Sequence, residues 1–131
     1  MPTLFLTIAE VLAIHETQIR RYGGALGLRD FSLLESAVAM PQASYGGNYL
    51  HDDLPSMAAA YCFHIVANHP FADGNKRTGA AAASVFLDMN AWNLAAGEDQ
   101  YAEFVLAIAS SRLDKQAAIA FFRQHALQAS G

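Results

Sequence analysis

Residues 69–78 read HPFADGNKRT, and this stretch decides how the chain is organised. Pro70 lacks a backbone N–H and disfavours helix at His69, so a helix that precedes the stretch should end there. The alanine-rich residues 78–89 that follow favour a second helix. The stretch is therefore predicted to be a tight loop between two helices, with its last residues in the first turn of the second helix.

The loop carries the residue types that phosphoryl or nucleotidyl transfer requires. His69 is the group in the loop that can act as a base near neutral pH. Asp73 offers an oxygen ligand for Mg²⁺ held between the protein and phosphates. Gly74 lets the backbone approach a ligand closely. The remaining polar residues are donors for phosphate oxygens: Asn75, Lys76 and Arg77.

Two cations at the start of a helix indicate an anionic ligand, because free N–H groups and the helix dipole attract anions there. The same dipole disfavours Lys76 and Arg77 by about 0.3–1 kcal/mol each. A bound phosphate would offset this cost. A base, a carboxylate for a metal and a cationic helix start in one short stretch therefore predict phosphoryl or nucleotidyl transfer.

These residues carry a family resemblance. HPFADGNKRT resembles the Fic/Doc signature, which is H-P-F-x-[DE]-G-N-G-R-x-x-R in the Fic branch and H-x-F-x-x-A-N-K-R-T in the death-on-curing (Doc) branch. The segments IHETQIRRYGG, LLESAVAMPQASYGG and FLDMNAW resemble Doc segments in the same order, so the resemblance covers about residues 4–95. Gly74 follows the Fic form. Lys76 stands where AMP-transferring members have glycine, and Ala80 stands where they have a second arginine.

The resemblance implies a fold and an activity. The fold would be all-α, a compact six-helix bundle with a flap loop, formed by residues 1–131 as a single domain. The activity would be that of a toxin that transfers a phosphoryl group from ATP to a Ser or Thr hydroxyl of a protein, with Mg²⁺ on Asp73 and His69 as the base. In characterised Doc-like members the target is elongation factor Tu, and translation stops. The flap would dock the target beside the active site through Tyr45, Gly46 and Gly47, although an ordinary surface loop explains these residues equally well.

Three alternatives compete with phosphoryl transfer. AMP transfer would use the same base with the other end of the triphosphate presented. Lys76 argues against it through its bulk and charge, and Ala80 because it cannot supply a second guanidinium fork. A non-catalytic binding module of the same fold would not need the intact His69 and Asp73. A metal phosphohydrolase, suggested by His51-Asp52, would need further histidines brought together from separate helices.

The resemblance also implies a separate inhibitor. Fic proteins that restrain themselves carry an inhibitory [ST]-x-x-x-E-[GN] helix, and Ser32-Leu33-Leu34-Glu35 has the wrong spacing for this motif. We therefore expect a Phd-like antitoxin, encoded beside this gene, that folds onto the toxin.

Composition limits the alternatives. The 131 residues are 53% hydrophobic and 15% charged, as expected of one globular domain. The net charge of −4 argues against direct nucleic-acid binding. The single cysteine, Cys62, cannot form an internal disulfide. The sequence suggests neither a signal peptide nor a membrane span, so a cytoplasmic location is expected.

Hydrophobic periodicity predicts six helices. The first begins after a capping box at Thr7 and places His15 on its apolar face, where a hydrogen-bonded core histidine is expected. The second ends near residue 39 after a cap at Asp30 or Ser32. The others are expected at about 55–68, 75–89, 99–110 and 114–127, the first of these being apolar on all sides and therefore central. The small residues 79–83 predict close helix packing, and a short hairpin fits within residues 41–54.

Overall fold

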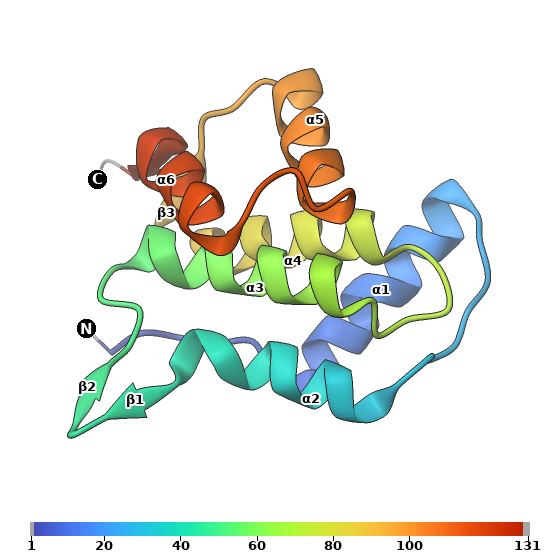
Figure 1. Cartoon of the computed structure of the whole chain (residues 1–131), viewed down its shortest axis with the longest axis horizontal. Coiled ribbons are helices and arrows are strands. Elements are labelled where there is room, and N and C mark those ends of the chain that lie inside the picture. The colour runs from blue at the N-terminus through green and yellow to red at the C-terminus, as the bar shows by residue number, and fades with distance from the viewer. Residues whose placement is uncertain (1, 130–131) are drawn as a thin grey trace.

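The computed structural model describes residues 2–129, and within them the chain forms six α-helices, as predicted (Figure 1). The helices are α1 (Ile8–Tyr22), α2 (Phe31–Ala39), α3 (Leu54–Asn68), α4 (Asn75–Met89), α5 (Glu98–Ala109) and α6 (Lys115–His125). The shorter elements are the 3-10 helix η1 (Met40–Gln42) and the strands β1 (Ser44–Tyr45), β2 (Asn48–Tyr49), β3 (Trp92–Leu94) and β4 (Ala126–Gln128). None of the helices among these residues has the length and hydrophobicity that a membrane-spanning helix requires.

Four of the six helices, α1, α2, α3 and α6, begin at a short polar residue whose side chain caps them. The Thr7 hydroxyl accepts a hydrogen bond from the Glu10 N–H, and the Glu10 carboxylate accepts one from the Thr7 N–H, which confirms the predicted capping box. Of the two candidate caps for α2, Asp30 is the one used, since its carboxylate accepts from the Leu33 N–H. Asp53 caps α3 in the same way.

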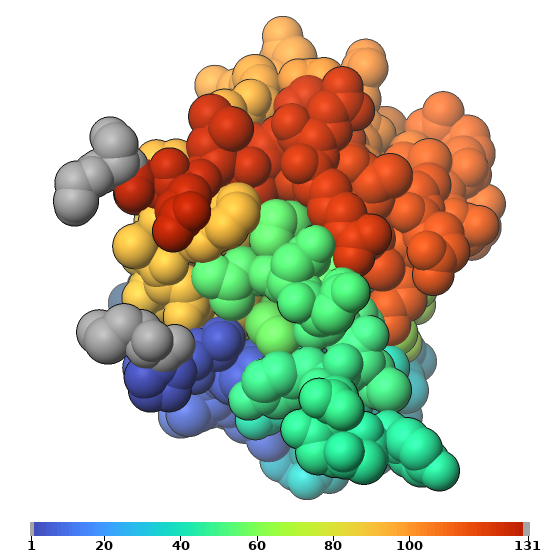
Figure 2. Space-filling model, turned by 90° about the vertical axis from the view of Figure 1, so that its left-hand side faces the viewer, coloured from blue at the N-terminus to red at the C-terminus, as the bar shows by residue number. Residues whose placement is uncertain are grey.

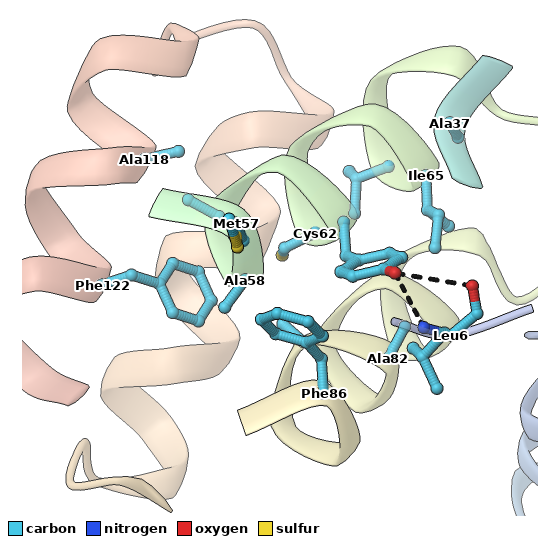
Figure 3. Packing of buried hydrophobic residues seen from close by; sticks show 14 of the residues in the cluster. Leu6, Ala37, Met57, Ala58, Cys62, Ile65, Ala82, Phe86, Ala118 and Phe122 are labelled. Atoms are coloured by element: carbon cyan, nitrogen blue, oxygen red, sulfur yellow. Dashed lines mark hydrogen bonds between the residues drawn. The ribbon is translucent and has the colours of Figure 1, made fainter. Parts of the chain in front are cut away.

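Helix α3 is the centre of the molecule, and it packs most extensively against α4, then α6 and α2. All six helices contribute to one buried hydrophobic cluster around it. Figure 3 shows Met57, Ala58 and Cys62 of α3 between Phe122 of α6 and Phe86 of α4. Burial raises the pKa of the Cys62 thiol to about 12, as suits an inert core cysteine.

The contact between α3 and α4 is close because Gly79 lies at it. A Cβ atom at this position would come within 2.6 Å of Val66 Cγ2 and 3.1 Å of the Cys62 carbonyl oxygen. The prediction that the small residues of α4 allow close packing against α3 is therefore confirmed at Gly79. This packing holds the end of α3 and the start of α4 together, and the loop between them is short.

The C-terminal end of the fold differs from the expectation. The last helix ends at His125, not near residue 127, because β4 leaves the helix and pairs antiparallel with β3. The partner of Leu127 is Asn93, far away in sequence, so local periodicity carries no sign of this pairing. The hairpin that residues 41–54 were expected to accommodate is present as β1 and β2.

A small group of basic side chains is formed by His51 before α3, His64 within α3 and Lys115 at the start of α6. His51 is buried, its Nδ1 atom and the Nε2 atom of His64 have no hydrogen-bond partner within residues 2–129, and Lys115 lies close enough to affect both. Burial, with Lys115 and His51 adding to it, lowers the pKa of His64 from 6.5 to about 4. Burial and Lys115 also lower the pKa of His51, against the opposing effect of Asp52. Both imidazoles are therefore neutral in the folded protein near pH 7.

We expect this group to make the fold sensitive to mild acid. The unfolded chain takes up protons at both histidines below pH 6.5, whereas the folded His64 resists until about pH 4, so stability falls as the pH falls through this window. Because His64 is partly exposed, we expect a loss of only about 1–2 kcal/mol between pH 7 and pH 5. Urea unfolding at the two pH values measures it, and His64→Gln should reduce the loss. An equal loss in His64→Gln would contradict the assignment.

Candidate functional site

His69 ends α3 in the left-handed backbone conformation, with φ 54° and ψ 53°. The predicted helix end is therefore confirmed, and Pro70 is the reason that the chain cannot continue as a helix. The left-handed conformation turns the chain sharply and leaves the imidazole exposed. His69 lines a cavity of about 420 Å³, which it shares with all the other predicted site residues of the loop: Asp73, Gly74, Asn75, Lys76 and Arg77.

The side chain of Asn75 closes the loop from within. Asn75 is buried, its Oδ1 atom accepts from the Phe71 N–H at 2.9 Å, and its Nδ2 atom donates to the Phe71 carbonyl at 3.0 Å. The sequence led us to expect this side chain to be a phosphate donor. In the structure its oxygen and one of its N–H groups serve the loop, because the buried backbone groups of Phe71 need partners.

Asp73 is exposed at the rim of the cavity, and two backbone groups hold its carboxylate. Oδ1 accepts from the Gly74 N–H at 2.9 Å and Oδ2 accepts from the Ala25 N–H at 3.2 Å. These two bonds, first from Ala25 and then from Gly74, lower the pKa of Asp73, so it is ionised at neutral pH. Gly24 makes room for the carboxylate, since a Cβ atom there would come within 2.7 Å of Oδ2.

His15 supports the loop from below. Its ring stacks on Phe71, with ring centroids 3.8 Å apart and planes within 5°, and its Nε2 atom lies 2.8 Å from the Asp73 carbonyl oxygen. Because a carbonyl oxygen can only accept, Nε2 carries the proton. His15 is buried, so the prediction of a hydrogen-bonded core histidine is confirmed.

The start of α4 presents hydrogen-bond donors to the cavity. Gly74 begins the helix without a side-chain cap, and within the described part of the chain the N–H groups of Asn75, Lys76 and Arg77 have no acceptor. The side chains of Lys76 and Arg77 are exposed, and the Arg77 guanidinium lies over the Tyr22 ring, 4.8 Å from its centroid. Free donors and two cations at a helix start suit an anion, so the start of α4 is a candidate anion site.

A second cavity of about 560 Å³ adjoins the first and shares Lys76 and Arg77 with it. It lies between α1, α4 and α5 and is mainly apolar, with Tyr22, Ala80, Tyr101, Val105 and Leu106 in its lining. The anion site therefore opens on one side into a groove that suits an apolar group.

The segment between α1 and α2 also borders the site, and its role was not foreseen from the sequence. Leu28 pairs with Phe71 in an isolated antiparallel bridge, and the Ala72 N–H donates to the Gly27 carbonyl at 3.0 Å. Figure 1 shows this light-blue segment on the same side of the molecule as the loop between α3 and α4. The sequence gives no local sign of this contact, because the two segments are about 40 residues apart.

The predicted flap of Tyr45, Gly46 and Gly47 does not lie beside His69, and its role in docking a target stays a prediction. The hairpin precedes the first residue of α3, whereas His69 follows its last, and a helix of 15 residues is about 22 Å long. Figure 1 places the hairpin and the loop at opposite ends of α3, and Figure 2 shows the hairpin projecting from that far face. Tyr45 is 83% exposed there, as in an ordinary surface turn.

Comparison with known proteins places the chain among relatives of one family. The model of the Fic/DOC family matches residues 5–87. The chain is similar to "Toxin Doc" of Mycolicibacterium smegmatis, with 46% identity over 78 residues, or 60% of each chain. It is also similar to "Protein kinase doc" of Escherichia phage P1, with 35% identity over 81 residues, or 62% of this chain and 64% of that protein. The match thus spans about three fifths of the length of these curated relatives.

The position of Asn75 leads to a prediction that separates loop closure from ligand binding. Asn75→Ala leaves the buried N–H and carbonyl of Phe71 without partners, which should lower the free energy of unfolding by about 2–4 kcal/mol. Lys76→Ala, at the exposed neighbouring position, should change it by less than about 0.5 kcal/mol. Urea unfolding of both variants without ligand measures the difference. Equal stability of Asn75→Ala and the wild type would refute the loop-closing role.

Proposed function

Because the chain belongs to the Fic/DOC family, we propose that it is a Doc-like toxin that transfers a phosphoryl group from ATP to a Ser or Thr hydroxyl of a protein. One observation carries the proposal. The exposed imidazole of His69 lines the same cavity as the uncapped start of α4 and its two cations. A base and an anion site that face one cavity are the minimum for transfer of a phosphoryl group to a hydroxyl.

In this proposal His69 is the general base. Its imidazole accepts the proton of the target hydroxyl, the hydroxyl oxygen bonds to the γ-phosphorus, and ADP leaves with the electron pair of the broken bond. A base positioned in this way typically contributes about 10²–10⁴-fold to the rate. The exposure of His69 suits this role, because a protein hydroxyl has to reach the ring from solvent.

The start of α4 would hold the phosphates. The N–H groups of Asn75, Lys76 and Arg77 supply donors that are already oriented by the helix, and the side chains of Lys76 and Arg77 supply positive charge. Gly74 assists through its backbone, with φ 77°, where a Cβ atom would come within 2.9 Å of Ile19 Cδ1. A larger side chain at this position would crowd Ile19 and would have to adopt a left-handed backbone conformation that favours glycine.

Asp73 fits a role as a ligand of Mg²⁺. It is ionised, exposed at the rim of the cavity and held by two N–H groups that leave further lone pairs on both oxygens. Within residues 2–129 no group of three or more His, Cys, Asp or Glu side chains could hold a metal by itself. This suits Mg²⁺, which is commonly held by one carboxylate together with substrate phosphates and water. When bound, the ion would neutralise charge on the phosphates.

AMP transfer is the second candidate, and two residues count against it. Lys76 lines the cavity with a long cationic side chain at a position where AMP-transferring relatives have glycine. Ala80, one turn further along α4, contributes only a methyl group, and its carbonyl accepts from the Tyr101 hydroxyl at 2.6 Å. It supplies no second guanidinium. The name of the phage P1 relative, "Protein kinase doc", also supports phosphoryl transfer.

We further propose two protein partners. By family resemblance the target is elongation factor Tu, and its modification would stop translation. A Phd-like antitoxin would restrain the enzyme, and the groove between α1, α4 and α5 offers it an apolar surface beside the site. A segment bound there would cover Lys76 and Arg77, which line both cavities.

Labelled ATP tests the reaction. Incubation of the enzyme and elongation factor Tu with ATP labelled at the γ-phosphate should label the target, whereas ATP labelled at the α-phosphate should not. His69→Ala should reduce labelling by about 10²-fold or more, because the base is lost. His125→Ala, a histidine substitution on α6 away from the cavity, should leave labelling unchanged.

Label from the α-phosphate alone would replace phosphoryl transfer by AMP transfer. Failure of both labels, with a folded protein and with a cell lysate as the source of targets, would favour the non-catalytic module.

Expression in bacteria tests the toxin assignment. The wild type alone should arrest growth, and the neighbouring gene, expressed with it, should restore growth because its product covers the site. His69→Ala alone should be tolerated, and His125→Ala should still arrest growth. Normal growth with soluble, folded wild-type protein at the level reached by His69→Ala would contradict the assignment.

A further inference from the structure

We propose that Arg29 is a positioning residue that holds the catalytic base in its working conformation. Arg29 lies between α1 and α2, and its side chain reaches across to the end of α3. This inference rests on the proposed function only in taking His69 as the base. The effect on the conformation of His69 follows from the geometry alone.

The backbone of His69 needs an external restraint. It is one of three residues other than glycine with positive φ in the described part of the chain, and its side chain makes this conformation unfavourable. Helices often end in this conformation, but usually at glycine. A histidine keeps it only where surrounding contacts impose it, and the direction of the imidazole depends on it.

Arg29 supplies that restraint through two hydrogen bonds to successive carbonyls. Its Nε atom donates to the His69 carbonyl at 2.6 Å, and its Nη2 atom donates to the Asn68 carbonyl at 2.8 Å. No other donor within residues 2–129 reaches either oxygen. Fixing two consecutive carbonyls fixes the peptide plane between Asn68 and His69 and the one after His69. The dihedral angles of His69 lie between these two planes.

The backbone that carries Arg29 is itself held in place. The Arg29 N–H donates to the Pro70 carbonyl at 2.7 Å, and so does the Asp30 N–H at 3.0 Å. Asp30 is also the cap of α2, so the position of Arg29 is tied to the start of a helix. The positive charge in turn lies at the C-terminal end of α3, where the helix dipole favours it. The planar fork of arginine suits this task, whereas the single ammonium of lysine cannot reproduce both directions.

Arg29 acts on the base and not on the ligand. It lines neither of the two cavities, and both of its donors named above point at the backbone of α3. Loss of the side chain should therefore lower the rate of transfer without weakening nucleotide binding. Arg77, by contrast, lines both cavities and should affect binding directly.

Kinetics test the inference with Arg29→Ala, Arg29→Lys and the matched control Arg20→Ala. Arg20 is exposed on α1, and within residues 2–129 its side chain pairs only with Glu16, so Arg20→Ala should behave as the wild type. For Arg29→Ala we expect kcat to fall by about 10–100-fold, because a displacement of about 1 Å can cost this much. KM for ATP and the affinity for Mg-ADP, measured by calorimetry, should stay within about twofold. Arg29→Lys should recover little, and added guanidinium ion should recover part of the rate of Arg29→Ala.

A spectroscopic measurement makes the test independent of activity. The backbone ¹³C shifts of His69 should be those of a left-handed residue in the wild type and Arg20→Ala, and should move away from these values in Arg29→Ala. Unchanged shifts in Arg29→Ala would overturn the inference, and so would a raised KM with an unchanged kcat. If the wild type transferred no phosphate, the proposed function would fail, but the shifts would still decide whether Arg29 holds His69. If Arg29→Ala did not fold, Arg29→Lys would give the same comparison.

Discussion

The fold depends on the close packing of α3 against α4, and this packing makes the connection between them unusual. The two helices approach each other where Gly79 faces the Cys62 carbonyl, and the chain has to reverse within the few residues from His69 to Gly74. Such a reversal leaves backbone groups in the interior, and each of them needs a partner. The side chain of Asn75 meets this need for Phe71, and the left-handed backbone of His69 provides the turn.

The short reversal between α3 and α4 also forms the candidate site. Because the chain turns immediately after α3, His69 is at the end of a buried, rigid helix with its imidazole at the surface. Because α4 starts directly after the loop, its free N–H groups face the cavity that His69 lines. The residues proposed as the base and the anion site are thus brought together by one short connection. Side chains on helix ends are held more precisely than those on a long loop.

Support for the loop comes from segments that are distant in sequence. His15 of α1 lies beneath it, bonded to the Asp73 carbonyl and stacked on Phe71. The Ala25 N–H holds the Asp73 carboxylate, and Arg29 holds the carbonyls at the end of α3. The residues that would touch ATP are therefore contiguous, whereas those that orient them come from the first 30 residues. In this respect the site resembles metal centres, where outer residues orient the ligands.

The sequence by itself determined those features that depend on residues close to one another in the chain. Caps at Thr7 and at Asp30 or Ser32, apolar periodicity and Pro70 predicted the helices and the end of α3, and the residue types of the loop predicted the family. Only the tertiary structure decided which groups meet across the fold. It assigned Asn75 to loop closure, brought Arg29 to His69, placed the hairpin of Tyr45 at the far end of α3, and ended α6 early so that β4 could pair with β3. The physical reason is that caps and helix periodicity act between neighbours in the chain, whereas these contacts join segments whose separation in sequence says nothing about their distance in space.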